Sequence, residues 1–477
     1  MDEQRNDIPR RVNPRRKKRS KMQIFKESYL PLIITAAALI MILVFIIGSI
    51  SLAVQRSRYN KYMNKVTAES LAAEQERLSE EADTLIRQAD LLAARVDYEG
   101  ALAVLDTFSG NEEDFPQLTH KRDTYTLAMD QLVPWEDPGQ VVNLSFQLLI
   151  ADPARAFTNS IYGSSFNRNF VTTGEFSQIL QQLYENGYIL VSLDDFMGPV
   201  LQEDGTTVMQ SKTLYLPNGK KPLILTQTNV NYNIYLIDSD GDKLPDKDGG
   251  GFASKLVINN EGGFSCEMID ANGELVSGDF DLVPILEKFI ASHPDFSYRG
   301  AKAVLALTGY NGLFGYRTNA GAKADFGETA YQEALENAVT IADALRAAGY
   351  ELACYTYENI PYGTSGSAEI QADIENWQTE VVPLLGNIDT LVYAQNTDIA
   401  GQEDYTGEKF EILKKAGFRK FLGFCEAGQP WTSITDQYVR QGRILVSGAN
   451  MAHHADYFNS IFDASMTLDK TRGEVPN

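Results

Sequence analysis

The sequence contains few of the side chains that bind transition metals or form disulfide bonds. Its 477 residues include four histidines and three cysteines. Cys266, Cys354 and Cys425 are an odd number in a long chain, so they indicate no disulfide framework. The histidines leave few candidates for a metal site, namely His120, His293, His453 and His454.

Basic residues are outnumbered as well. The chain has 42 Lys and Arg against 64 Asp and Glu, a formal net charge of -22 and a pI near 4.7. Binding to nucleic-acid phosphates requires clustered Lys and Arg, so this balance argues against a nucleic-acid role for the main body. Hydrophobic residues make up 44% of the chain, which is enough for a large core, and the length allows about two or three domains.

Charge is absent from residues 29–54, directly after a strongly basic stretch at residues 1–28. As a helix the uncharged run would measure roughly 39 Å, more than the ~30 Å hydrocarbon core of a membrane. A secretory signal has a shorter apolar region of about 7–15 residues, so we predict an uncleaved transmembrane helix in contact with membrane lipid. Cleavage near Ser49-Ile50-Ser51 is the minor alternative. The heavier positive charge before the helix predicts a single-pass cell-membrane protein with a cytoplasmic N-terminus and an extracellular main domain.

Residues 55–133 are predicted to form a helical stalk. Residues 70–92 carry apolar side chains at helical spacing, and residues 93–108 are typical of a turn and a second helix. The pair resembles one tetratricopeptide-type helical hairpin, which would offer a docking surface to a protein partner, although stacked repeats normally come in threes or more. The run from Pro134 to Gly139 ends the helical pattern.

From residue 140 onward the sequence alternates between strand-like and helix-like segments, which predicts a parallel barrel or a doubly wound α/β sheet over residues 140–477. The predicted strands are residues 141–150, 188–192, 223–227, 303–307, 351–357, 390–394, 420–424 and 444–446. The predicted helices are residues 173–186, 282–292, 328–348, 369–385 and 407–416. Residues 252–270 indicate instead a β-hairpin, within an insertion at about 234–272.

Two of the predicted strands end in polar runs. The strand at 223–227 is followed by Thr228-Asn229, and the strand at 351–357 by Glu358-Asn359. In barrels built from alternating strands and helices the carboxyl ends of the strands face the ligand, so these residues are site candidates.

These segments resemble the polysaccharide deacetylases, carbohydrate esterase family 4, which share the NodB-type homology domain. The resemblance covers most of residues 140–462 and is carried by residues 143–150, 170–176, 221–232, 297–302, 308–310 and 315–318. It implies a distorted (β/α) barrel of about seven strands. It also implies removal of acetyl groups from N-acetylated sugars by hydrolysis of a carbon–nitrogen bond, with a divalent metal, usually zinc, and an Asp as general base.

The positions that match the family's metal and base motifs hold other residues. Where the family has Thr-Phe-Asp-Asp, this chain has Thr226-Gln227-Thr228-Asn229, and where the family has His-Ser/Thr-x-x-His it has Tyr355-Thr356-Tyr357-Glu358-Asn359. The resemblance thus places Thr228 at the base position and Asn229, Tyr355 and Asn359 at the metal positions. A hydroxyl, a neutral amide and a phenol are unsuited to these tasks, so we expect no zinc and no metal-dependent deacetylation.

Aromatic and amide side chains around the same strand ends favour glycan binding, because sugar faces stack on rings and sugar hydroxyls pair with amides. The candidates are Tyr232, Tyr310, Tyr316, Arg317, Tyr357, Tyr393, Asn396 and Trp431. Arg317 could hold a sugar carboxylate through a bidentate contact or pair with a neighbouring Asp. Several of the tyrosines could equally fill the core of the barrel.

An acidic loop within the insertion suits calcium. Asp238, Asp240, Asp242 and Asp246 place hard oxygen ligands around a glycine turn. The loop resembles those of thrombospondin type 3 repeats, and it departs from the EF-hand at Lys243 and Gly249. The alternative is a solvated acidic turn.

The sequence therefore predicts a membrane-anchored extracytoplasmic deacetylase-like protein that is catalytically inactive and acts in cell-wall glycan binding or scaffolding. One alternative is an active hydrolase that deacetylates polysaccharide or peptidoglycan with an atypical ligand set, which could include His453 or His454. A second alternative is a protein-interaction module that uses the stalk.

Overall fold

The computed structural model describes residues 20–401, 403–425 and 428–476. The chain divides into two compact units, Met1–Asp83 and Thr84–Asn477, and each is described by itself. Most of the predicted basic tail, residues 1–19, lies outside the described residues.

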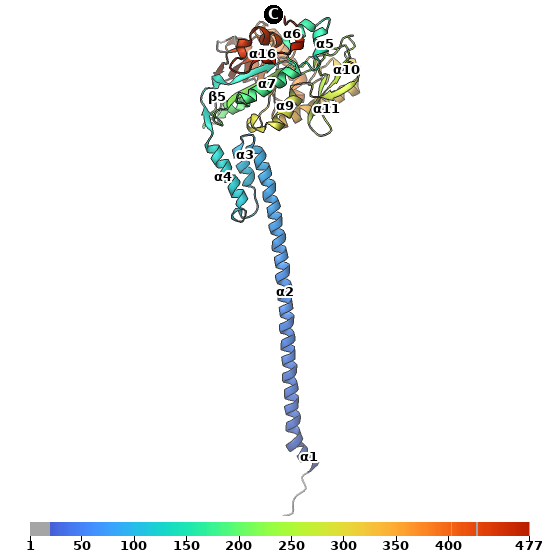
Figure 1. Ribbon diagram of the computed structural model, residues 1–477, viewed down its shortest axis with the longest axis vertical. Coiled ribbons are helices and arrows are strands. Elements are labelled where there is room, and N and C mark those ends of the chain that lie inside the picture. Colours follow the sequence, from blue (N-terminus) through green and yellow to red (C-terminus); the bar gives the residue numbers. More distant parts are fainter. Residues whose placement is uncertain (1–19, 402, 426–427, 477) are drawn as a thin grey trace, which may run out of the picture. The chain divides into compact units, whose positions relative to one another are not determined.

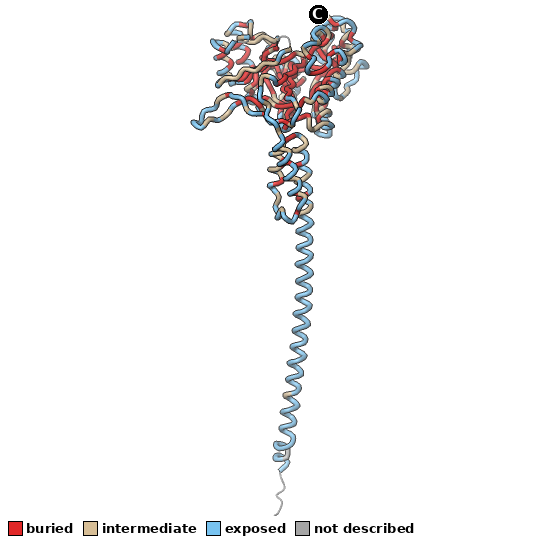
Figure 2. Tube along the Cα trace, turned by 60° about the vertical axis from the view of Figure 1, so that its left-hand side comes forward, coloured by how far each residue is buried: buried red, intermediate tan, exposed pale blue. Residues whose placement is uncertain are grey.

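The first unit is helical. It contains α1 (Lys21–Ile24), a π-helical turn (Phe25–Tyr29) and most of α2 (Leu30–Ala93), whose residues 39–77 are exposed (Figure 2). An 18-residue window of this helix has a mean hydropathy of 3.0, and within the described residues it is the one helix long and apolar enough to cross a membrane. The sequence predicted a span followed by separate stalk helices, whereas α2 runs through both regions without a break. The reason is local: residues 49–93 contain neither Gly nor Pro, so nothing ends the helix there.

The second unit begins with a helical hairpin. After the last turns of α2, α3 (Tyr98–Leu105) and α4 (Pro116–Asp130) pack on one another, and the phenol of Tyr125 on α4 donates to Asp90 at 2.6 Å. The hairpin is also tied to the α/β part, because the Arg299 amide donates to the Arg95 carbonyl at 2.8 Å. The predicted domain boundary near residue 134 therefore marks a change of secondary structure within one compact unit.

A closed barrel of seven parallel strands forms the centre of this unit. Around the ring each strand pairs with the next one in the chain, and the last pairs with the first. The strands are β2 (Val142–Phe146), β7 (Lys221–Thr228), β11 (Val304–Leu307), β12 (Glu351–Cys354), β13 (Thr390–Val392), β14 (Lys420–Phe424) and β16 (Val439–Leu445). The predicted fold class, a distorted seven-strand (β/α) barrel, is confirmed.

The distortion lies at β7. Its first residues pair with β3 (Tyr188–Leu190), and its last residues pair with β11, so β3 fills the place beside β7 that β11 leaves open. All eight predicted strands are present, but β16 begins five residues before the predicted start.

Strand residues alternate between the inside and the outside of the barrel. The inside is lined by small and branched side chains such as Ile224, Ala306, Ala353 and Val392, because seven strands enclose little space. The outside packs against helices, several of which are labelled around the strands in Figure 1. The larger helices on this face are α7 (Thr173–Glu185), α9 (Leu282–Ser292), α11 (Glu328–Ala347), α12 (Ser367–Asn376) and α14 (Gly407–Lys415).

The insertion is larger than predicted. In place of a two-stranded hairpin it forms a three-stranded antiparallel sheet of β8 (Lys255–Ile258), β9 (Phe264–Ile269) and β10 (Leu275–Gly278). The sequence did not predict three further pairings: β4 (Met197–Leu201) with β5 (Thr207–Ser211), β1 (Val133–Trp135) with β6 (Leu214–Leu216), and β15 (Thr432–Ile434) with β16. The remaining α-helices are short: α5 (Pro153–Thr158), α6 (Gly163–Asn169), α8 (Leu193–Phe196), α10 (Ala322–Phe326), α13 (Val382–Leu385), α15 (Gly448–His453) and α16 (Ala464–Thr467).

Candidate functional site

Three neighbouring strands end in polar side chains that have no partner. Asn229 follows β7, Thr308 follows β11 and Asn359 follows β12 by a short turn. The amide oxygens of Asn229 and Asn359 and the hydroxyl of Thr308 are shielded from solvent and have no hydrogen-bond partner among the described residues. Because these strands are parallel and adjacent, the three groups belong to the same end of the barrel. We call this end, with Asn229, Thr308, Tyr355 and Asn359, the barrel mouth.

Left-handed backbone conformations shape the mouth. Asn229 has a φ of 61°, Thr356 of 60° and Asn359 of 57°. Asparagine visits this region readily, whereas the β-branched Thr356 is strained there. Three hydrogen bonds hold the turn after β12 in place: the Thr356 hydroxyl accepts from the Ile360 amide at 2.9 Å, and the Asp373 carboxylate accepts from the Tyr357 and Glu358 amides at 2.7 and 2.8 Å.

Phenol groups gather around the mouth. Tyr355 follows β12 directly, is 8% exposed, and its amide donates to the Leu307 carbonyl at 2.7 Å. Burial raises the pKa of Tyr235 to about 12, and the phenols of Tyr310, Tyr162 and Tyr355 add to the rise. Tyr235 is 42% exposed, and its ring lies 5.7 Å from that of Tyr162. Sequence reasoning missed Tyr235, since nothing in the run Tyr232-Asn233-Ile234-Tyr235 distinguishes its second tyrosine from its first.

A buried cation lies inside the barrel near Tyr355. Arg443 on β16 is 2% exposed and donates from Nη1 to the Ser145 hydroxyl, from Nε to the Gly423 carbonyl and from Nη2 to the Tyr393 carbonyl, at 2.8, 3.0 and 3.1 Å. Burial lowers the pKa of its guanidinium, and the phenol of Tyr355 opposes this shift.

The buried arginines differ in their charge partners. Arg440 and Arg472 are paired with Asp398 and Glu175. No carboxylate of the described part of the chain forms an ion pair with Arg443. Sequence reasoning missed Arg443 because β16 was expected to begin after it.

The donor set of the mouth does not fit zinc. The positions that the family resemblance assigns to the base and the metal are Thr228, Asn229, Tyr355 and Asn359, and none is a carboxylate, an imidazole or a thiol. The Thr228 hydroxyl is already engaged with the Phe146 carbonyl at 3.3 Å. The Arg443 cation near Tyr355 would also repel a divalent ion. The same groups suit a neutral ligand that offers hydrogen-bond donors.

Two predicted ligand tyrosines are core residues instead. Tyr232 is 1% exposed, and its hydroxyl donates to Asp281 at 2.7 Å. Tyr393 has no exposed surface and packs on the outer side of β13, with its ring 6.1 Å from that of Phe421. Neither ring can offer a face to a sugar, so the prediction of glycan contact at these two residues is wrong.

Other candidates are engaged with protein groups. The Tyr357 hydroxyl donates to Glu380 at 2.7 Å, and the Trp431 indole donates to the Phe424 carbonyl at 3.2 Å. Asn396 follows β13 with a φ of 56°, and Tyr310 lies near Tyr235 as described above. For these residues glycan contact stays a prediction.

The histidines of the alternative hydrolase lie on the surface. His453 ends α15 and its Nε2 is 2.9 Å from the Val475 carbonyl oxygen, while the ring of His454 stacks on that of Tyr457 at 4.9 Å. Within residues 20–401, 403–425 and 428–476, neither histidine belongs to a group of three side chains placed to share a metal ion.

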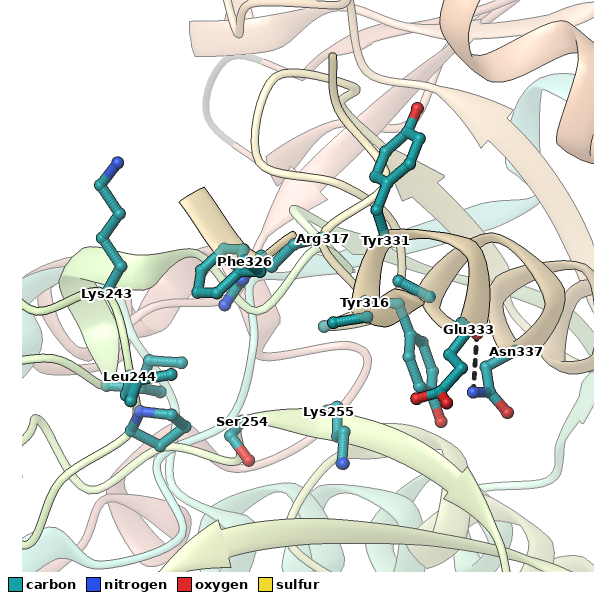
Figure 3. Close-up of a pocket in the computed structure, with 15 residues that line it drawn as sticks. Lys243, Leu244, Ser254, Lys255, Tyr316, Arg317, Phe326, Tyr331, Glu333 and Asn337 are labelled. Atoms are coloured by element: carbon teal, nitrogen blue, oxygen red, sulfur yellow. Dashed lines mark hydrogen bonds between the residues drawn. The ribbon is translucent and has the colours of Figure 1, made fainter. Parts of the chain in front are cut away.

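Tyr316 and Arg317 lie in the segment that follows β11. They line a pocket of about 320 Å³ between the insertion and the helices α10 and α11, shown in Figure 3. None of the four mouth residues lines this pocket, and glycan contact at Tyr316 and Arg317 stays a prediction.

The acidic loop brings three of its four predicted calcium ligands together. One carboxylate oxygen from each of Asp238, Asp240 and Asp246 lies within 4.8 Å of the others. Asp242 is outside this group and accepts from the Leu244 amide at 2.8 Å. The three converging carboxylates could hold a hard divalent cation.

Comparison with known proteins finds one fold likeness. No protein-family description matches the chain, and no curated protein matches it either. Among solved structures, the deacetylase PplD of Streptococcus pyogenes in complex with acetate matches over 71% of this chain and 99% of its own, with 14% sequence identity and a TM-score of 0.35. At this identity and score the likeness assigns neither a family nor an activity to this chain.

Proposed function

We propose that this chain is a membrane-anchored protein whose extracytoplasmic, deacetylase-like barrel binds glycan without hydrolysing it, as a recognition or scaffolding element of the cell wall. The observation that carries this proposal is the set of three unpartnered polar groups on Asn229, Thr308 and Asn359. A buried polar group without a partner costs about 1–3 kcal/mol. A ligand that supplies hydroxyl or amide N–H donors would recover this free energy on binding.

N-acetylated sugars offer such donors. Their hydroxyl and acetamido N–H groups can donate to the amide oxygens of Asn229 and Asn359, and the nearby phenols of Tyr235 and Tyr310 can pack on the ring face. The absence of a carboxylate, imidazole or thiol at the four motif positions supports binding without catalysis. The length and composition of α2 support a single membrane span, and the basic residues before it support an extracytoplasmic barrel.

The test has two parts, both on the purified full-length chain in detergent. Sedimentation with insoluble chitin or peptidoglycan measures binding, and acetate release from chito-oligosaccharides together with metal analysis measures catalysis. We expect sedimentation, no acetate above background and no stoichiometric zinc. Stoichiometric zinc with turnover would overturn the proposal in favour of an active hydrolase, and failure to sediment would remove glycan binding and leave a protein-interaction role for the helical hairpin.

Three single substitutions test whether glycan binds at the mouth. Asn229→Gly and Asn359→Gly remove the amides and keep the left-handed backbone, since glycine adopts it without strain. Thr308→Val removes the unpartnered hydroxyl at nearly constant volume. Each change should weaken sedimentation about tenfold, the value of one buried hydrogen bond. Asn272→Gly, in the exposed turn between β9 and β10, is the control.

A calcium ion in the acidic loop is a second proposal, supported by the convergence of Asp238, Asp240 and Asp246. The ion would brace the loop and take no part in chemistry at the mouth.

A further inference from the structure

The pocket beside the barrel is lined by none of the four mouth residues. The acidic loop contributes Leu244 and Pro245, β8 contributes Lys255, and α11 contributes Glu333 and Ala334. Figure 3 shows Leu244 on one side of the pocket, Glu333 and Asn337 on the other, and Ser254 and Lys255 along one wall. Its volume of about 320 Å³ accommodates a single-ring ligand.

Two of the three cations that line the pocket are paired with carboxylates. Lys243 pairs with Asp325 at 2.6 Å, and Lys255 pairs with Glu267 at 2.9 Å. In the part of the chain that the structure describes, Arg317 forms no ion pair with a carboxylate. Glu333, the acid that lines the pocket, is exposed on α11.

The partners of Arg317 are neutral backbone groups. Its Nη1 donates to the carbonyls of Asn311 and Asn231 at 2.8 and 3.4 Å, and its Nη2 donates to the Tyr232 carbonyl at 2.8 Å. Burial lowers the pKa of this guanidinium to about 10. A cation that burial disfavours to this extent gains free energy when an anion comes within contact distance.

The uncharged residues that line the pocket set a second requirement for its ligand. Tyr316, Phe326 and Tyr331 contribute rings, and Ile237, Ala330 and Ala334 contribute aliphatic surface. Such walls favour a ligand with a flat or partly apolar ring face.

We propose that this pocket binds a small carboxylate carried on a six-membered ring, with the carboxylate at Arg317 and the ring against Tyr316 and Phe326. Arginine suits this role because its planar fork matches a carboxylate. The ring could belong to a sugar acid or to an aromatic acid. The inference goes beyond the proposed function, since it concerns a pocket that the four mouth residues do not line and does not require glycan binding at the mouth.

Ligand-observed NMR on the full-length protein in detergent tests the proposal with matched probes. Glucuronate is compared with glucose, and benzoate with benzamide, so that each pair differs in the carboxylate. We expect a carboxylate to bind at least tenfold more tightly than its neutral counterpart. Binding of glucuronate alone assigns the pocket to sugar acids, and binding of benzoate alone assigns it to aromatic acids.

Two variants test whether the carboxylate binds in this pocket. Arg317→Gln removes the charge and should weaken carboxylate binding at least tenfold. Because Arg317 also holds three backbone carbonyls, Ala334→Trp provides a second variant that fills the pocket from α11 and leaves Arg317 in place. Ala347→Trp, on an exposed position of the same helix outside the pocket, is the matched control. Equal affinity for the neutral probes, full binding in Ala334→Trp, or no binding of either acid at about 10 mM would overturn the proposal.

Discussion

Arg443 on β16 donates a hydrogen bond of 2.8 Å to the hydroxyl of Ser145 on β2, where the last strand of the barrel meets the first. Only Ile444 and Leu445 form backbone register pairs with β2, whereas β2 and β7 share five such pairs. Side chains reinforce this short seam, because Gln441 also donates to the Val141 carbonyl at 3.1 Å and accepts from Asn143 at 2.9 Å. The barrel is thus closed in part by polar side chains.

Replacing Arg443 should weaken this closure. In Arg443→Met, the Ser145 hydroxyl and the carbonyls of Gly423 and Tyr393 lose their donor in a dry interior. We expect the free energy of unfolding to fall by about 2–4 kcal/mol, measured by urea denaturation of the full-length protein. Arg419→Met, at an exposed position before β14, is the control and should change stability by less than about 0.5 kcal/mol. A loss no larger than that of the control would show that the seam does not depend on Arg443.

The strands could be predicted where aliphatic and β-branched residues follow one another in the sequence. Leu223–Gln227 and Thr390–Ala394 are mainly aliphatic or β-branched, and both strands were found in place. The start of the strand Val439–Leu445 was not predicted, because the four consecutive residues 440–443 (Arg-Gln-Gly-Arg) include no aliphatic side chain and break the apolar pattern. Gln441 and Arg443, whose hydrogen bonds help to close the barrel, are thus among the residues that make this strand hard to predict from the sequence.

The location of the mouth could be predicted, but not which tyrosines surround it. Polar runs at strand ends identified Asn229 and Asn359. Tyr393 was misassigned because it shares the outward parity of Leu391, while Val392 and Ala394 face inward. Tyr232 was misassigned because its partner Asp281 is distant in the sequence. Such contacts are set by tertiary packing, which residue type and spacing do not encode.

Glu351 at the start of β12 should make stability depend on pH. Burial raises its pKa to about 7; Lys420 opposes the shift, and Asp194 and Asp195 add to it. The unfolded chain releases this proton near the ordinary value of 4.5, whereas the folded chain retains it until about pH 7. The contribution of Glu351 to the free energy of unfolding is therefore fully present below pH 4.5 and is lost as the pH rises through 7.

The variant Glu351→Gln keeps an acceptor for the Leu193 amide, now 3.0 Å away, and removes the titration. We expect the pH dependence of unfolding between about pH 5 and 8 to be flatter by roughly 1–3 kcal/mol than in the unmodified protein. Glu336→Gln on the exposed face of α11 should leave the profile unchanged. If the stability of Glu351→Gln and that of the unmodified protein depended on pH in the same way, the raised pKa of Glu351 would be contradicted.

Calcium should stabilise the acidic loop. Without a cation, Asp238, Asp240 and Asp246 repel one another, and loop amides such as that of Lys243, which donates to Asp238 at 2.9 Å, hold them together. The free energy of unfolding should be about 1–3 kcal/mol higher in millimolar calcium than in the presence of a chelator. This is the stabilisation expected when the calcium concentration is about 10–100 times the dissociation constant of the site. Asp240→Asn should reduce the effect and Asp248→Asn, just outside the group, should not. Identical thermal unfolding with calcium and with chelator would exclude the site.

Asp373 on α12 should control the order of the turn that carries Asn359. Its carboxylate accepts from the amides of Tyr357 and Glu358 and, at 2.6 Å, from the hydroxyl of Tyr362. In Asp373→Ala these donors lose their acceptor, and we expect the two amides to exchange hydrogen at least tenfold faster, because each lost bond is worth about 1 kcal/mol or more. Asp343→Asn on α11 is exposed and should leave this exchange unchanged. If the mouth binds glycan through Asn359, Asp373→Ala should also weaken sedimentation with chitin, whereas faster exchange with full binding would place the ligand contacts on β7 and β11 alone.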